Sequence, residues 1–372
     1  MEQLELKKIQ DWYSKNYQHK VSGRRVILDS ILPILDSLSE KFSVHKIGKS
    51  FLKRDIYKIQ IGTGKTKVLL WTQMHGNEST GTKALFDLFQ FLENPGDTDS
   101  IQKNILENLT IICIPILNPD GADAYTRVNA QQIDLNRDVI DKKAAESILL
   151  QDVLSEVNPQ YCFNMHDQRT IFSVGATNEP ATISFLAPSE DVERSLTEGR
   201  KKTMHVINSM VKVLQQAIPN QIGRYTDEFY PTATGDNFQK MGYNTVLIES
   251  GHFKDDYDRE VSRKFTFFAL LQGLVYISSK PESDDHLPYF QIPDNEMFYL
   301  DILLKNVYFK EQLTDIGLQF QEIVDKDGIS FVPKIDKVES LSGYNANKIM
   351  DANKLRFDNE EDLLNWVKTV IY

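Results

Sequence analysis

Cysteine is scarce in this sequence, with 2 residues among 372. Cys113 and Cys162 lie in apolar stretches, and neither belongs to a Cys-x-x-Cys pair. This usage argues against a disulfide framework and against thiolate ligation of a metal. We therefore expect both cysteines to be packed as free thiols.

Long hydrophobic runs and an excess of positive charge are also missing. The longest apolar-rich stretch, 265–277, contains Thr266 and Gln272 and is too short to span a bilayer. Residues 1–8 lack the basic and apolar regions of a signal peptide, so a cytoplasmic location is the default expectation. The net charge of −11 argues against a nucleic-acid partner. The remaining composition is that of a globular protein. We expect no membrane partner.

Apolar segments alternate between strand-like and helix-like patterns over most of the chain. This alternation predicts an α/β fold with a mixed β-sheet and helices on both faces. Two amphipathic helices, 1–17 and 24–40, precede two strands, 42–48 and 54–62, and Gly62–Lys65 is predicted as a hairpin turn to the next strand. The further strands are expected near 67–74, 109–117, 160–165 and 245–250, and the further helices near 79–93, 142–156, 190–217 and 258–279.

A polar segment, 280–285, has no apolar period and predicts a domain boundary. We therefore expect a catalytic domain over residues 1–280 and a small C-terminal α+β extension over residues 286–372. The extension is expected to contain a helix near 295–305, strands at 317–324 and 329–333, and a closing helix from Asn359. No motif in it carries chemistry, so packing, partner binding and a substrate lid stay open as its roles.

His75-Gly-Asn-Glu78 lies between a predicted buried strand and a predicted helix. Ligand sites of α/β proteins collect at such strand ends, and an imidazole with a carboxylate three residues away suits zinc. The pair alone is weak evidence, because 7 His and 53 acidic residues should give about one such pair by chance. His252-Phe-Lys-Asp255 is a second pair of this kind.

A second apolar strand, 160–165, also ends in a histidine, His166. A catalytic zinc site takes three protein ligands and leaves one position for water. His75, Glu78 and His166 are therefore the expected ligands of one zinc ion per chain.

Polar side chains are concentrated between these ligands. Asn118-Pro-Asp-Gly121 is expected to be a turn. Arg127 is a candidate to stabilise the oxyanion that develops on an attacked carbonyl. Asn136 with Arg137 can hold a substrate carboxylate. Asp134 can accept the other ring N–H of His75 and so fix its tautomer.

Glu249 ends a short apolar strand, Val246-Leu-Ile. A carboxylate at this position can take a proton from a zinc-bound water and pass it to the leaving amine. The alternative is a glutamate that caps the following turn or pairs with a basic residue.

In their order along the chain, these motifs resemble the zinc carboxypeptidase family, the carboxypeptidase A-like metallopeptidases. The resemblance covers roughly residues 40–280 and rests on His75-Gly-Asn-Glu78, Asn118-Pro-Asp-Gly121, Arg127-x-Asn-Ala, Asp134-Leu-Asn-Arg137, His166 and Ile248-Glu249. It implies zinc on His75, Glu78 and His166, with Glu249 as general base. It also implies that Arg127 polarises the scissile carbonyl and that Asn136 and Arg137 bind the terminal carboxylate.

Two segments depart from the family pattern. Tyr230 matches the mobile tyrosine of the family, but the segment from Tyr230 to Asp236 is shortened. The neighbours of His166 are polar and have no family counterpart, and among them Arg169 is a candidate for an additional substrate contact.

The sequence as a whole predicts a zinc-dependent hydrolase, a metallopeptidase that cleaves an amide bond next to a free carboxylate. Its expected substrate is a peptide or an acyl-amino acid. An amidohydrolase that acts on a small acyl-amino acid or a cell-wall peptide is the alternative enzyme. A non-catalytic peptide-binding module is the alternative of another class, and the intact Glu249 argues against it.

Overall fold

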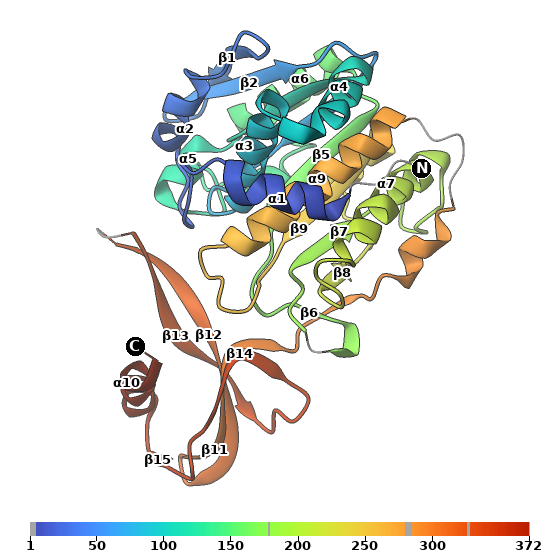
Figure 1. Ribbon diagram of the computed structural model, residues 1–372. Coiled ribbons are helices and arrows are strands. Elements are labelled where there is room, and N and C mark those ends of the chain that lie inside the picture. Colours follow the sequence, from blue (N-terminus) through green and yellow to red (C-terminus); the bar gives the residue numbers. More distant parts are fainter. Residues whose placement is uncertain (1–4, 178, 280–284, 326–327, 372) are drawn as a thin grey trace.

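The computed structural model describes residues 5–177, 179–279, 285–325 and 328–371. The larger part of the chain is built on an eight-stranded mixed sheet (Figure 1). Its strands are β1 (Ser43–Lys49), β2 (Asp55–Ile61), β3 (Thr66–Trp71), β4 (Leu109–Ile114), β5 (Tyr161–Asp167), β7 (Ile183–Leu186), β8 (Ile222–Arg224) and β9 (Asn244–Ser250). They are ordered β1-β2-β4-β3-β5-β9-β7-β8, and the central four, β4-β3-β5-β9, are parallel.

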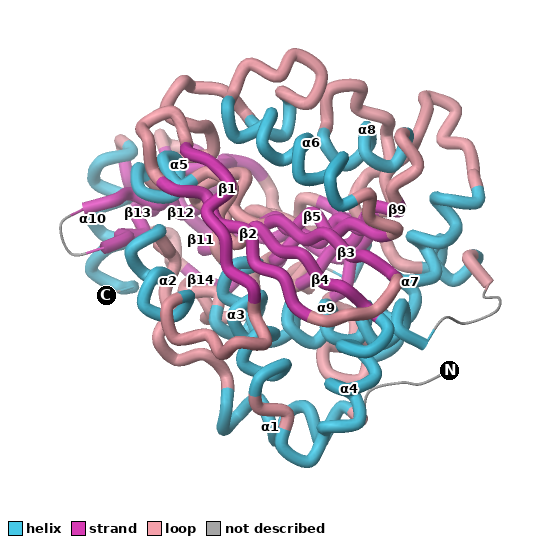
Figure 2. The backbone as a smooth tube through the Cα atoms, turned by 90° about the horizontal axis from the view of Figure 1, so that it is seen from above, coloured by secondary structure: helices cyan, strands magenta, loops and turns pink. Residues whose placement is uncertain are grey.

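Helices cover both faces of this sheet, as the sequence predicted (Figure 2). One face carries α1 (Leu6–Asn16), α3 (Thr80–Glu93), α4 (Asp99–Asn108), α7 (Glu198–Leu214) and α9 (Glu260–Ser279). The other face carries α6 (Ala145–Val157) and α8 (Thr234–Lys240). Two further short helices, α2 (Leu28–Leu35) and α5 (Pro119–Ala124), contact each other.

The buried part of β3, residues 68–71, is apolar without interruption. Val68 and Leu70 pack into the core cluster that contains α3, α7 and α9. Leu69 and Trp71 point to the opposite face and pack with residues of α6 and α8. A parallel strand that is buried on both faces needs apolar side chains at every position, and alternation is therefore absent.

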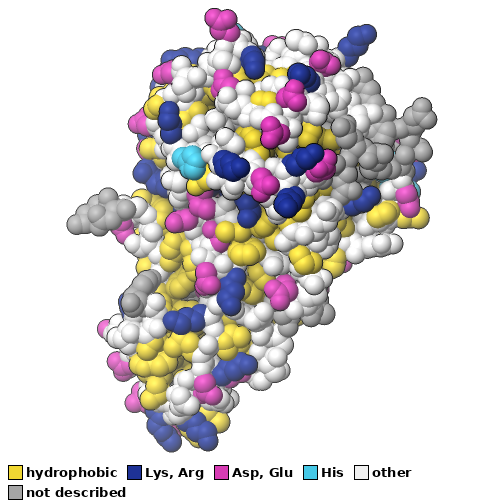
Figure 3. Space-filling view, viewed as in Figure 1, with side chains coloured by type: hydrophobic (Ala, Val, Ile, Leu, Met, Phe, Trp, Pro, Cys, Tyr) yellow, Lys and Arg dark blue, Asp and Glu magenta, His cyan; other side chains and the backbone are white. Residues whose placement is uncertain are grey.

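The C-terminal part of the chain forms a second, smaller sheet, which we call the C-terminal module (residues 299–371). Its elements are β11 (Tyr299–Phe309), β12 (Gln312–Asp325), β13 (Gly328–Glu339), β14 (Asn345–Asp351), β15 (Arg356–Phe357) and α10 (Glu360–Ile371). The strand order is β13-β12-β11-β14, and β15 pairs with β11. The module lies at one end of the larger part, and its surface in Figure 3 carries many hydrophobic side chains.

Three local predictions were wrong. Residues 299–309 are the strand β11 and not part of a helix, because this segment is the inner strand of the small sheet and is buried on both faces. Gly62–Lys65 does not close a hairpin, because β4 lies between β2 and β3. The helix expected over residues 24–40 is confined to α2.

The expectation for the two cysteines holds in the structure. Cys113 and Cys162 are buried free thiols. Within the described ranges, no helix has both the length and the apolar character needed to cross a membrane.

Candidate metal centre and active site

His75 and Glu78 lie in the loop that joins β3 to α3. This loop packs so closely on the start of α5 that a Cβ added to Gly76 would lie 1.9 Å from the backbone carbon of Gly121. Asn118 fixes the same contact, since its side chain accepts from Gly121 N and donates to the carbonyl of Met74. The segment from Asn118 to Gly121, expected as a turn, therefore begins the short helix α5 and shapes the loop that carries two of the ligands.

His166 lies near the end of β5, which pairs with β3, so two neighbouring strands bring the three candidate ligands to one edge of the sheet. Nδ1 of His75 is 2.8 Å from Oε1 of Glu78, and Nδ1 of His166 is 2.8 Å from Oε2. The two Nδ1 atoms are 3.2 Å apart.

These three buried side chains fit a zinc ion. Their ligand atoms lie within 4.8 Å of one another, and they form the metal-ligand cluster found among the described residues. Two imidazole nitrogens and a carboxylate are a ligand set of catalytic zinc sites. His252 lies outside this cluster, and its Nε2 is bonded to Asn347 of β14.

Asp134 supports both a ligand and the candidate oxyanion group. Its Oδ1 is 3.0 Å from Nε2 of His75, which is the contact that the sequence predicted. Its Oδ2 accepts from Nε of Arg127 at 3.0 Å. The guanidinium of Arg127 also reaches Oε1 of Glu78 at 3.4 Å, so it lies beside the ligand cluster.

Glu249 stands next to His166, because the two residues are register partners on the parallel strands β5 and β9. It lines the same cavity as the three ligands. Burial raises the pKa of Glu249 well above its usual value, and the carboxylates of Glu78 and Asp167 raise it further. A divalent cation on the ligands would act in the opposite direction, since a nearby positive charge favours the carboxylate.

Asn136 and Arg137 also line the cavity and belong to the 3-10 helix η2 (Leu135–Arg137). Oδ1 of Asn136 accepts from the backbone N–H of Thr234, so its Nδ2 group is the part that can donate to a ligand. The guanidinium of Arg137 lies 4.2 Å from the ring centroid of Tyr230 and donates to the carbonyl of Asn136 at 2.7 Å; among the described residues it forms no ion pair. Tyr230 is half exposed and also lines the cavity.

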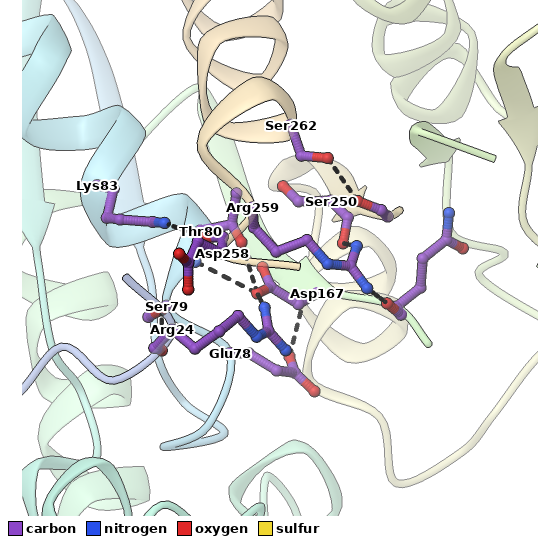
Figure 4. Close-up of polar contacts among 12 residues, drawn as sticks. Arg24, Glu78, Ser79, Thr80, Lys83, Asp167, Ser250, Asp258, Arg259 and Ser262 are labelled. Atoms are coloured by element: carbon purple, nitrogen blue, oxygen red, sulfur yellow. Dashed lines mark hydrogen bonds and ion pairs between the residues drawn. The ribbon is translucent and has the colours of Figure 1, made fainter. Parts of the chain in front are cut away.

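Several cavity residues were not recognised from the sequence. Arg24, Asp167 and Arg259 form a buried charged group beside the ligands (Figure 4). Asp236 lines the cavity near Tyr230, whose N–H it accepts, and burial raises its pKa to about 6. Asp167 and Asp236 lie next to motifs that the sequence did single out, whereas no local pattern marks Arg24 or Arg259.

Other lining residues come from the C-terminal module: Gln319, Phe320 and Glu322. Arg169, a sequence candidate, is exposed at the cavity wall.

Comparison with known proteins places this site in a family. Residues 31–221, just over half of the chain, match the zinc carboxypeptidase family. That segment includes His75, Glu78 and His166, whereas Tyr230 and Glu249 lie beyond it. The chain is 25% identical to mouse carboxypeptidase M over 207 residues, which cover 48% of this chain and 46% of that protein. It is 29% identical to carboxypeptidase 2 of Trichophyton tonsurans over 106 residues, 27% of this chain and 19% of that protein. The matches thus span less than half the length of either relative.

Solved structures agree on the fold. A metallo-carboxypeptidase from Burkholderia cenocepacia superimposes with a TM-score of 0.57 at 16% identity, over 70% of each chain. Carboxypeptidase A from Helicoverpa armigera gives a TM-score of 0.55 at 15% identity, over 75% of this chain and 81% of the other. The predicted fold class is therefore confirmed. With the family match and a His-Glu-His cluster that could hold the family's metal, this chain belongs to the zinc carboxypeptidase family.

Proposed function

We propose that the protein is a zinc-dependent hydrolase that cleaves the amide bond next to a free carboxylate. The observation that carries this proposal is a single cavity lined by the three ligands, Glu249 and the guanidinium of Arg137, which has no carboxylate partner among the described residues. The cavity thus offers a base beside a metal site and a cation that can bind a carboxylate.

The roles of the side chains follow from their positions. A zinc ion on the three ligands would lower the pKa of a bound water and polarise the substrate carbonyl. Glu249, which faces this position from the neighbouring strand, accepts the proton and later donates it to the leaving amine. Arg127 donates to the oxygen on which negative charge develops. Arg137 and the Nδ2 group of Asn136 bind the substrate carboxylate, and Tyr230 holds the guanidinium plane in place.

A comparison of free acids with carboxamides tests the proposal. Zinc-loaded protein is incubated with a peptide library in which each member is present both with a free C-terminus and as its amide. Because hydrogen bonds to charged groups contribute about 1.5–3 kcal/mol, the free acids should react roughly 10- to 150-fold faster. Arg137→Ala should remove most of this preference by slowing the free acids.

Two outcomes would point to the alternatives. Equal rates for acids and amides in the wild type would remove the carboxylate clamp and favour an amidohydrolase that acts on other amides. Tight binding of library members without turnover would favour a peptide-binding module.

A further inference from the structure

The cavity at the metal ligands, about 610 Å³ in volume, is not built by the catalytic domain alone. Gln319, Phe320 and Glu322 of strand β12 line it together with the ligands and Glu249. The C-terminal module is therefore part of the site. A cavity of this size is in the range that encloses one small molecule.

Glu322 joins the module to the neighbourhood of the ligands. Its Oε1 lies 2.8 Å from Nη2 of Arg24, and its Oε2 accepts from the hydroxyl of Tyr125. Nη1 of Arg24 lies 3.3 Å from Asp167, and the backbone N–H of Asp167 donates to Oε2 of the ligand Glu78 at 3.1 Å. The side chains of Arg24 and Asp167 are only 6% and 3% exposed. Separating Glu322 from Arg24 would therefore leave a buried charge without its partner.

Other contacts hold the module on the loop that follows Glu249. Asp301 of β11 accepts from the hydroxyl of Tyr257 at 2.8 Å, and the Tyr257 ring packs edge-on against Phe320 at 5.2 Å. Asn347 of β14 accepts from the backbone N–H of Asp255 at 2.7 Å. The module is thus fixed in place next to the strand that carries the base.

The module and the residues proposed to bind the carboxylate are linked to different metal ligands. His75 is linked through Asp134 to the backbone N–H of Asn136, whereas Glu78 is linked through Asp167 to Arg24. Among the described residues, no hydrogen bond or ion pair joins Asn136 or Arg137 directly to Arg24 or to Glu322. A substrate whose carboxylate is at Arg137 and whose amide is at the ligands has its acyl part in the rest of the cavity, which Gln319, Phe320 and Glu322 of β12 help to line.

We propose that the C-terminal module forms a fixed wall across the acyl side of the site and restricts the substrates to short ones. The inference rests on the proposed function, because the carboxylate clamp sets the direction of the substrate. Arg24 contacts Asp167, the residue after a ligand, and an extended residue spans about 3.3–3.6 Å. Glu322 is joined to the ligand Glu78 through Arg24 and Asp167, so the acyl part meets the wall after a few residues. The substrates are therefore N-acyl-amino acids and short peptides, and not the C-termini of folded or long polypeptides.

A length series tests this proposal. The best free-acid substrate of the library is extended at its acyl side to one, two, four and eight residues, with the same neutral N-terminal cap. In the wild type, kcat/KM should fall at least tenfold between two and four residues. Phe320→Ala removes an aromatic ring from the wall, and Glu322→Ala removes the carboxylate that contacts Arg24. Each variant should raise kcat/KM for the four-residue member relative to the one-residue member. Glu339→Ala, an exposed residue of β13, is the control and should keep the wild-type profile.

The outcomes separate this inference from the proposed function. Equal kcat/KM for all lengths in the wild type would overturn the wall and leave the hydrolase intact, and this measurement needs no variant to fold. A length limit that persists unchanged in folded, zinc-loaded Phe320→Ala and Glu322→Ala protein would also overturn it. If no member of any length is cleaved by zinc-loaded wild type, the proposed function fails and this inference fails with it.

Discussion

Oδ1 of Asp134 lies 3.0 Å from Nε2 of His75, on the ring edge opposite the nitrogen that faces Glu78. A carboxylate in this position holds the Nε2 proton, and it leaves the lone pair of Nδ1 for a metal. Because the same carboxylate also binds Arg127, the ligand and the candidate oxyanion group are positioned by one residue.

Asp134→Asn should weaken zinc binding about 10- to 100-fold, the usual effect of losing such a partner. Zinc affinity is measured by competition with a chelator. Asp141→Asn changes an exposed aspartate near the same segment, which pairs with Lys143, and should leave the affinity unchanged. Equal affinities in the two variants would show that Asp134 does not support His75.

The ligand assignment predicts about one zinc ion per purified chain, the number that one three-ligand site holds. His166→Ala should lose most of this zinc, because one of three ligands is missing. His252→Ala should retain it, since His252 is bonded to Asn347 and lies outside the cluster. Elemental analysis of the two variants decides the matter, and the same zinc content in both would refute the assignment.

Asp301 gives a prediction about stability and pH. Burial raises the pKa of this carboxyl from 3.8 to about 6, so the folded state holds the proton more tightly than the unfolded state. Protonation of Asp301 therefore adds to the free energy of unfolding below about pH 4, and this stabilisation is lost as the pH rises through about 6. A pKa difference of this size corresponds to roughly 3 kcal/mol.

Asp301→Asn cannot titrate, so the free energy of unfolding of the variant should fall less than that of the wild type between pH 4 and 6.5. Urea unfolding at a series of pH values measures the two slopes. Asp336→Asn, at an exposed site of the same module, should keep the wild-type slope. Parallel slopes for Asp301→Asn and the wild type would show that Asp301 ionises normally in the folded protein.

The position of the candidate site was largely predictable, because its residues lie in short segments at strand ends. His75, His166 and Glu249 each follow or end a short apolar run typical of a buried strand, and the parallel strands β3, β5 and β9 are neighbours. Polar residues at the ends of such strands meet at one edge of the sheet. The order of the motifs along the chain then indicated the zinc carboxypeptidase family.

The wall of the cavity was not predictable in this way. Arg24 contacts Asp167, which lies 143 residues away in the sequence, and Glu322, which lies 298 residues away. No local sequence pattern indicates that Arg24 and Glu322 are partners. The strand β11 was missed for a different reason. In an apolar segment that is buried on both faces, polar and apolar residues do not alternate. The periodicity of the sequence then cannot distinguish a strand from a buried helix.

The central claim is that Glu249 acts as the base beside a metal on His75, Glu78 and His166. Glu249→Gln keeps the size of the side chain and removes the base, and Glu156→Gln is a matched change at an exposed site of α6. Zinc content and the turnover of the best free-acid substrate are measured together in both variants and the wild type. The account predicts wild-type zinc in all three, and turnover reduced about 10²–10⁴-fold in Glu249→Gln alone. Turnover of Glu249→Gln within a few-fold of the wild type, at full zinc content, would contradict it.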